Sequence, residues 1–94
     1  MVVFTYTQTD TILGKLTNGR KIVLTTVTVT NGGLDLTTIT VKPLTRIIKW
    51  VFGLRHPHDV DFDTADGATY ANTVSINPTA DATGCVLEIL SVGE

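Results

Sequence analysis

Most of the residues that usually carry chemistry are scarce in this sequence. Its 94 residues include one cysteine, two histidines and two serines, and aromatic side chains make up only 6%. A single cysteine excludes an internal disulfide, so nothing in the sequence implies oxidative folding. Charged residues amount to 17% and the formal net charge is −2. So small a charge gives no reason to expect a nucleic acid or an acidic membrane as partner, and we expect protein partners.

Targeting and membrane signals are missing as well. The opening residues carry no basic segment ahead of an apolar run, which a secretory signal peptide requires. No segment approaches the roughly 18 consecutive apolar residues of a membrane-spanning helix. We therefore expect a protein that is made in the cytoplasm and is not secreted through a signal peptide.

Threonine is the residue that the sequence has in abundance, with eighteen copies. Threonine is β-branched, so it favours strands, and it presents a methyl group to its neighbours and a hydroxyl to water. Hydrophobic residues reach 43%, which suits a chain with room for one core. The composition predicts a single β domain over residues 1–94, with sheets that face water without much charge.

A β-hairpin is predicted in the first half of the chain. Residues 20–30 alternate so that their valines share one face. The triplet Asn31-Gly32-Gly33 follows directly and is a strong turn signal, because glycine accepts positive φ at little cost. Residues 34–42 are interpreted as the second arm of the hairpin, with a bulge near Thr37-Thr38 that reconciles a change in their apolar phase.

The other strands follow from the same alternation. Residues 45–54 place Trp50 on the same side as Ile48 and Phe52, which predicts a largely buried tryptophan. No long window shows helical spacing with a cap. The remaining strand segments are 2–7, 11–16, 73–76 and 85–92. About seven short antiparallel strands at this spacing predict an all-β fold, either a small β-sandwich or a small barrel.

The stretch 55–71 lacks periodicity and predicts a long surface loop. It holds both histidines and a series of alternating aspartates that begins at Asp59. Alternating carboxylates can gather around calcium, but here the spacing fails. Counted from Asp59, no glycine falls at the sixth position, and Tyr70 stands at the twelfth, where a glutamate is required. The two histidines also lack the further ligands of a structural zinc site, so we interpret the segment as a solvated acidic loop.

No arrangement of residues in the sequence predicts catalysis. The two serines and Cys85 lie in predicted strands, and neither histidine stands in a recognisable pairing with a nucleophile. Free cysteine usually behaves as a small hydrophobic residue, so Cys85 is expected in the core. The sequence also lacks a glycine-rich phosphate loop. We expect a protein that is not an enzyme and needs no cofactor.

Two predicted strand segments, 47–52 and 85–92, are substantially apolar on both faces. A sheet with one face in water does not need this, so one of these faces is a candidate interface. The same pattern leaves Trp50 open to two interpretations, as a core residue or an interface residue. The candidate interface combines one face of the first segment with the loop that follows it: Ile47, Lys49, Val51, His56, His58, Phe62 and Tyr70.

Short motifs spread along most of the chain carry a resemblance to known proteins. They are Phe4-Thr5-Tyr6-Thr7, Thr11-Ile12-Leu13-Gly14-Lys15, Asn31-Gly32-Gly33, Leu44-Thr45-Arg46-Ile47, Thr83-Gly84-Cys85 and Val92-Gly93. In this layout the chain resembles a loose group of small virion-associated proteins of tailed bacteriophages. The resemblance implies a β-structured component of the virus particle, one that coats and reinforces the capsid.

The expected function is therefore that of a capsid decoration, or cement, protein located in the virion. Such a protein would bind the major capsid protein or another virion protein and act as a homo-oligomer. One alternative within the structural class is a component of the tail tube or a fibre. The other alternative is a small carbohydrate-binding module, which would use Trp50 or Tyr70 as an aromatic platform.

We predict that the loop 55–71 does not bind calcium tightly, because its carboxylates lack the spacing of a calcium loop. Micromolar free calcium should leave the melting temperature unchanged relative to a sample that contains a chelator. A ligand that binds only the folded state raises its stability. A clear calcium-dependent rise in melting temperature would therefore contradict the prediction.

Overall fold

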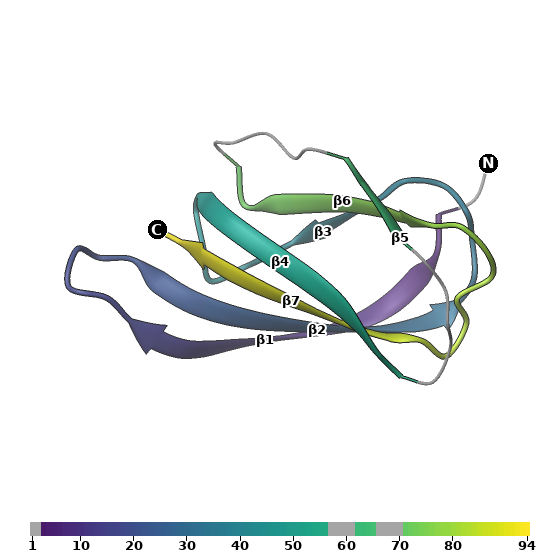
Figure 1. The fold of residues 1–94 in the computed structure, drawn as a ribbon, viewed down its shortest axis with the longest axis horizontal. Coiled ribbons are helices and arrows are strands. Elements are labelled where there is room, and N and C mark those ends of the chain that lie inside the picture. The colour runs from purple at the N-terminus through teal and green to yellow at the C-terminus, as the bar shows by residue number, and fades with distance from the viewer. Residues whose placement is uncertain (1–2, 57–61, 66–70) are drawn as a thin grey trace.

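Seven strands supply the regular structure of the described residues (Figure 1). The structure is a computed structural model and describes residues 3–56, 62–65 and 71–94. The strands are β1 (Thr5–Lys15), β2 (Lys21–Asn31), β3 (Thr37–Thr40), β4 (Ile47–His56), β5 (Phe62–Ala65), β6 (Thr73–Pro78) and β7 (Val86–Gly93). They form one sheet in the order β1-β2-β7-β4 and a second in the order β3-β6-β5, and the paired strands are antiparallel. The predicted all-β class is confirmed.

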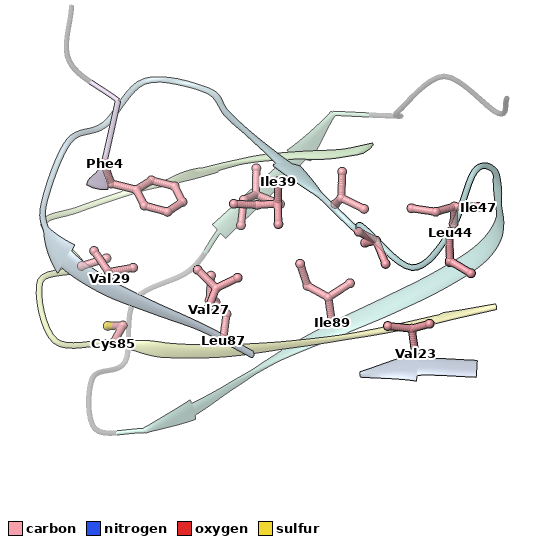
Figure 2. Packing of buried hydrophobic residues seen from close by; sticks show 14 residues of the cluster. Phe4, Val23, Val27, Val29, Ile39, Leu44, Ile47, Cys85, Leu87 and Ile89 are labelled. Atoms are coloured by element: carbon pink, nitrogen blue, oxygen red, sulfur yellow. The ribbon is translucent and has the colours of Figure 1, made fainter. Parts of the chain in front are cut away.

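The two sheets pack face to face around one apolar cluster. Figure 2 shows Val27 and Leu87 of the four-stranded sheet pointing toward Ile39 of the three-stranded sheet. The buried members of the cluster are Phe4, Val23, Val27, Val29, Ile39, Val41, Leu44, Ile47, Val74, Ile76, Ala82, Cys85, Leu87 and Ile89. Of the two predicted architectures, the described residues therefore form the sandwich. The expected core position of Cys85 is also confirmed.

The strand β2 shows most clearly why this sequence forms a sandwich. Its inward positions are valines and one threonine, Thr25, and all of them are buried, while the positions between them are more open. β2 pairs with β1 along one edge and with β7 along the other, so its backbone polar groups are satisfied on both sides. Because β-branched side chains pack well on a pleated surface, the sequence Lys21–Asn31 stabilises a central strand.

Polar side chains of β1 connect the two sheets along one side of the sandwich. The hydroxyl of Tyr6 donates a hydrogen bond to the carbonyl oxygen of Thr38 at 3.3 Å, and Gln8 Nε2 donates to that of Thr40 at 2.6 Å. Both carbonyls belong to β3, which is an edge strand of the other sheet. An edge strand whose carbonyls are engaged in this way is a poorer template for pairing with another chain.

The same row of β1 continues to Asp10. Its carboxylate accepts a hydrogen bond from Thr25 Oγ1 at 2.7 Å and another from Gln8 Nε2 at 3.1 Å. Thr25 is fully buried, and a buried hydroxyl without a partner would be costly. Asp10 therefore allows a polar residue to occupy an inward position of the central strand.

Glu94 connects the end of β7 to the start of β4. Its backbone oxygen accepts hydrogen bonds from the Thr45 N–H at 2.6 Å and from Thr45 Oγ1 at 2.8 Å, and its carboxylate pairs with Arg46 at 2.8 Å. A Cβ on the adjoining Gly93 would collide with the carbonyl oxygen of Arg46. The close approach of the two strands at this end therefore requires glycine.

The predicted hairpin between residues 20–30 and 34–42 is wrong. β2 and β3 lie in different sheets, so the chain crosses between layers after Asn31. The Gly32 N–H donates instead to Thr83 Oγ1 at 2.9 Å. Among the described residues, the glycines with positive φ are Gly19 and Gly84, so the triplet that begins at Asn31 makes a crossover and not a tight turn.

Two further segments differ from the prediction. Residues 5–7 and 11–15 of the two segments 2–7 and 11–16, which were expected as separate strands, belong to the single strand β1, and the chain then turns at Gly19. The predicted loop 55–71 contains the end of β4 and all of β5. The parts of that loop at 57–61 and 66–70 lie outside the described residues.

Two inward residues of β7 form a matched pair for a test of stability. Leu87 and Ser91 are both fully buried, but Ser91 Oγ has no hydrogen-bond partner among the described residues. Leu87→Ala should lower the free energy of unfolding by about 2–5 kcal/mol. Ser91→Ala should leave it unchanged or raise it, because an unsatisfied buried hydroxyl costs about 1–3 kcal/mol. Urea unfolding measures both; a loss above about 1 kcal/mol in Ser91→Ala would indicate a bonded hydroxyl.

Candidate interaction surface

The predicted interface residues of β4 do not all lie on one face. The pairing of β4 with β7 has a register shift between Ile47 and Lys49, and such a bulge re-aims the side chains on either side of it. Ile47 is only 5% exposed and belongs to the core. Its assignment to the interface is therefore wrong. Lys49 and Val51 are both exposed and lie on the outer face of the four-stranded sheet.

The remaining predicted interface residues are distributed over other parts of the chain. His56 ends β4 and Phe62 begins β5, so these two residues lie in different sheets. His58 and Tyr70 lie outside the described residues. A contribution of these four residues to an interface stays a prediction.

Val51 is part of an apolar row that crosses the four-stranded sheet. Leu24 on β2 stands opposite Leu90 on β7, and Leu90 stands opposite Val51 on β4. Directly opposed residues share a face of the sheet, and here Val51 is 65% exposed and Leu90 38%. The neighbouring row places Ile22 opposite Val92. We call these five residues the outer apolar patch.

Polar side chains border the outer apolar patch. Lys49 stands opposite Val92 at one end, and Glu88 stands opposite Thr26 on the other side of the Leu24 row. The outward positions of the edge strand β1 include three threonines. They are Thr7, Thr9 and Thr11. An apolar centre with a polar rim is the usual composition of a protein–protein interface.

The chain matches no protein-family model, no curated protein and no solved structure. Function therefore has to be inferred from the surfaces of the chain itself.

Four of the five members of the patch were not among the predicted interface residues: Ile22, Leu24, Leu90 and Val92. The apolar character of both faces of segment 85–92 contained the signal for Leu90. It did not show which strands lie beside β7. Because β7 lies between β2 and β4, Leu24 and Val51 become neighbours of Leu90 although they are far apart in sequence.

Trp50 lies on the inner face of β4, opposite Ser91, and packs against the core cluster. It is partly buried, less so than predicted. A ring that packs against the core from the inner face of its sheet is not a free platform on which a sugar can stack. This placement argues against Trp50 as the sugar platform, whereas Tyr70, the other predicted platform, lies outside the described residues.

The part of the chain that the structure describes contains neither a candidate metal site nor a candidate membrane-spanning helix. Within residues 3–56, 62–65 and 71–94, no three His, Cys, Asp or Glu side chains gather in a way that could hold a metal ion. In the same ranges, no helix is long and apolar enough to cross a membrane.

Proposed function

We propose that this chain is a non-enzymatic structural protein of a virus particle, a capsid decoration protein that acts as an oligomer. It binds a repeated site on the protein shell and strengthens the shell. The observation that supports this proposal best is the outer apolar patch. Its residue on the edge strand β4, Val51, is 65% exposed. The resemblance of the sequence to virion-associated phage proteins indicates that the partner is a protein of the viral shell.

The patch has the physical properties that such a contact needs. Removing apolar surface from water contributes roughly 25 cal/mol per Å², so exposed leucine and valine side chains favour a bound state. The patch lies on a hydrogen-bonded sheet, and a rigid surface loses little conformational entropy when it binds. A standard interface buries about 800 Å² per partner, a modest share of the 5485 Å² surface of the chain. The shell contact therefore leaves room for contacts between copies.

The two alternatives differ in how they would use this surface. A tail-tube or fibre component would use the same patch against a different viral protein. A carbohydrate-binding module would need an open aromatic ring, and Trp50 packs against the core instead. The exposed apolar residues support a protein-binding structural role, and the resemblance to phage proteins favours the decoration protein among such roles.

The variant Val51→Glu should weaken attachment to the shell, because it places a charge at the apolar centre of the contact. Thr38→Glu is the matched control, since Thr38 is an exposed residue of β3, in the other sheet. Virions of the encoding virus that lack the chain are mixed with each purified protein, and bound protein is quantified. Wild type and Thr38→Glu should bind alike, whereas Val51→Glu should bind at least about tenfold more weakly.

The same particles are then heated and exposed to low salt. Particles with bound wild-type protein should survive conditions that rupture particles without it. Equal resistance with and without the chain would contradict the decoration proposal, as would full binding by Val51→Glu. Equal resistance together with specific binding in a glycan assay would favour the carbohydrate-binding alternative.

A further inference from the structure

The two ends of the long axis of this molecule expose different apolar clusters. The molecule measures 41 × 24 × 17 Å along its principal axes. At one end, the hairpin that joins β1 to β2 reaches beyond the three-stranded sheet (Figure 1). The start of β1 and the connection from β2 to β3 lie at the other end (Figure 1). We call residues 12–21 the hairpin arm.

The hairpin arm is an ordered structure with an apolar surface. Leu13, at a register shift in the pairing of β1 with β2, is 55% exposed. Ile12 and Leu16 are also exposed. The Leu16 N–H donates to the carbonyl oxygen of Arg20 at 2.7 Å, and Gly19 takes a φ of 81°, so the turn is closed by backbone geometry. The arm therefore presents its apolar side chains on a fixed support.

The second cluster consists of Val3, Leu34 and Leu36, which we call the distal patch. A backbone bridge between Val3 and Asp35 holds the N-terminal segment beside the two leucines that flank Asp35. Leu34 is 56% exposed, and Val3 and Leu36 are exposed as well. The distal patch is therefore built from two segments that the bridge holds together.

The hairpin arm and the segments that carry the distal patch bear charges of opposite sign. The hairpin arm carries Lys15, Arg20 and Lys21, and residues 11–22 contain no acidic side chain. The distal end carries Asp35 and Asp81, and residues 1–9, 29–37 and 78–87 contain no lysine or arginine. The two ends thus combine exposed apolar groups with complementary charge.

Asp81 belongs to the distal end through contacts that the structure describes. Its carboxylate lies against Gly32, where a Cβ would collide with it, and it accepts a hydrogen bond from the Thr83 N–H at 3.0 Å. Gly32 directly follows β2 and lies two residues before Leu34. The carboxylate is therefore held close to the crossover that carries the distal patch.

We propose that copies of this chain associate head to tail, with the hairpin arm of one copy seated on the distal patch of the next. Both surfaces gain by removing exposed leucine from water, and the complementary charges orient the contact. Because the two surfaces differ, each bound copy keeps one free arm or one free patch. Such a heterologous contact builds a ring if the rotation closes and a filament if it does not.

The charges also exclude the symmetric arrangements. An arm-to-arm dimer would bring Lys15, Arg20 and Lys21 against the same cations of the partner. A patch-to-patch dimer would bring Asp35 and Asp81 against the same anions. Like charges at a contact cost free energy, so the arm of one copy fits the distal patch of another better than either surface fits itself.

The inference rests on the oligomer in the proposed function and adds the surfaces through which the copies meet. It leaves the outer apolar patch free for the shell. Self-association can be measured on the pure chain and shell attachment on particles. The two proposals can therefore fail separately.

The test uses one variant for each surface. Leu13→Asp blocks the arm, Leu34→Lys blocks the distal patch, and Val51→Glu is a control that changes an exposed residue outside both. Circular dichroism checks that each variant is folded, and sedimentation velocity measures association over a range of concentrations. Wild type and Val51→Glu should associate, and high salt should weaken this association because it screens the charges. Each blocked variant alone should dissociate at least about tenfold more readily.

An equimolar mixture of Leu13→Asp and Leu34→Lys should associate again, because each variant retains the surface that the other lacks. A symmetric dimer would behave differently, since one of the two variants would then associate alone as strongly as wild type. That result would overturn the proposal. A wild-type chain that stays monomeric up to millimolar concentration, or a mixture that stays monomeric, would overturn it as well.

Discussion

β2 is hydrogen-bonded to β1 along one edge and to β7 along the other, and its inward face is closed by the second sheet. The covering sheet is shorter than β2. β1 and β2 have 11 residues each, whereas β6 has 6. At about 3.3 Å per residue, the long strands extend well beyond their cover. The hairpin arm therefore projects past the three-stranded sheet (Figure 1), and its three apolar side chains are exposed.

Threonines on the outer face distinguish the β1 side of the four-stranded sheet from the outer apolar patch. Thr7 stands opposite Thr28 and Thr9 opposite Thr26, so the β1 side of the outer face is polar without being charged. The few cations gather near the hairpin arm instead, and the described distal end carries aspartates. A chain with a net charge of −2 therefore carries three cations on its hairpin arm and two described aspartates beside the distal patch, although its composition gives no sign of this.

The sequence predicted what depends on one strand alone. Alternation identified β2 and β7, and the solitary Cys85 was correctly placed in the core. Features that depend on which strands lie side by side in the fold were not predictable. The glycines after Asn31 can form a tight turn or a crossover, and the choice follows from which sheet receives the next strand. The alternation of apolar and polar residues in 45–54 does not indicate the bulge that moves Ile47 into the core. The outer apolar patch likewise required the strand order, because only that order places Leu24 and Val51 beside Leu90.

The position of β7 has a consequence for how the chain folds. β7 is the last strand in chain order, yet it lies between β2 and β4 in the middle of its sheet. The β1–β2 hairpin is local and can form early, but the pairing of β7 joins strands that are distant in sequence, and such contacts form slowly. Until β7 docks, β2 and β4 both keep free edges, and open strand edges promote aggregation. A newly made chain is therefore most vulnerable to misassembly before its final strand arrives, whatever the stability of the finished sandwich.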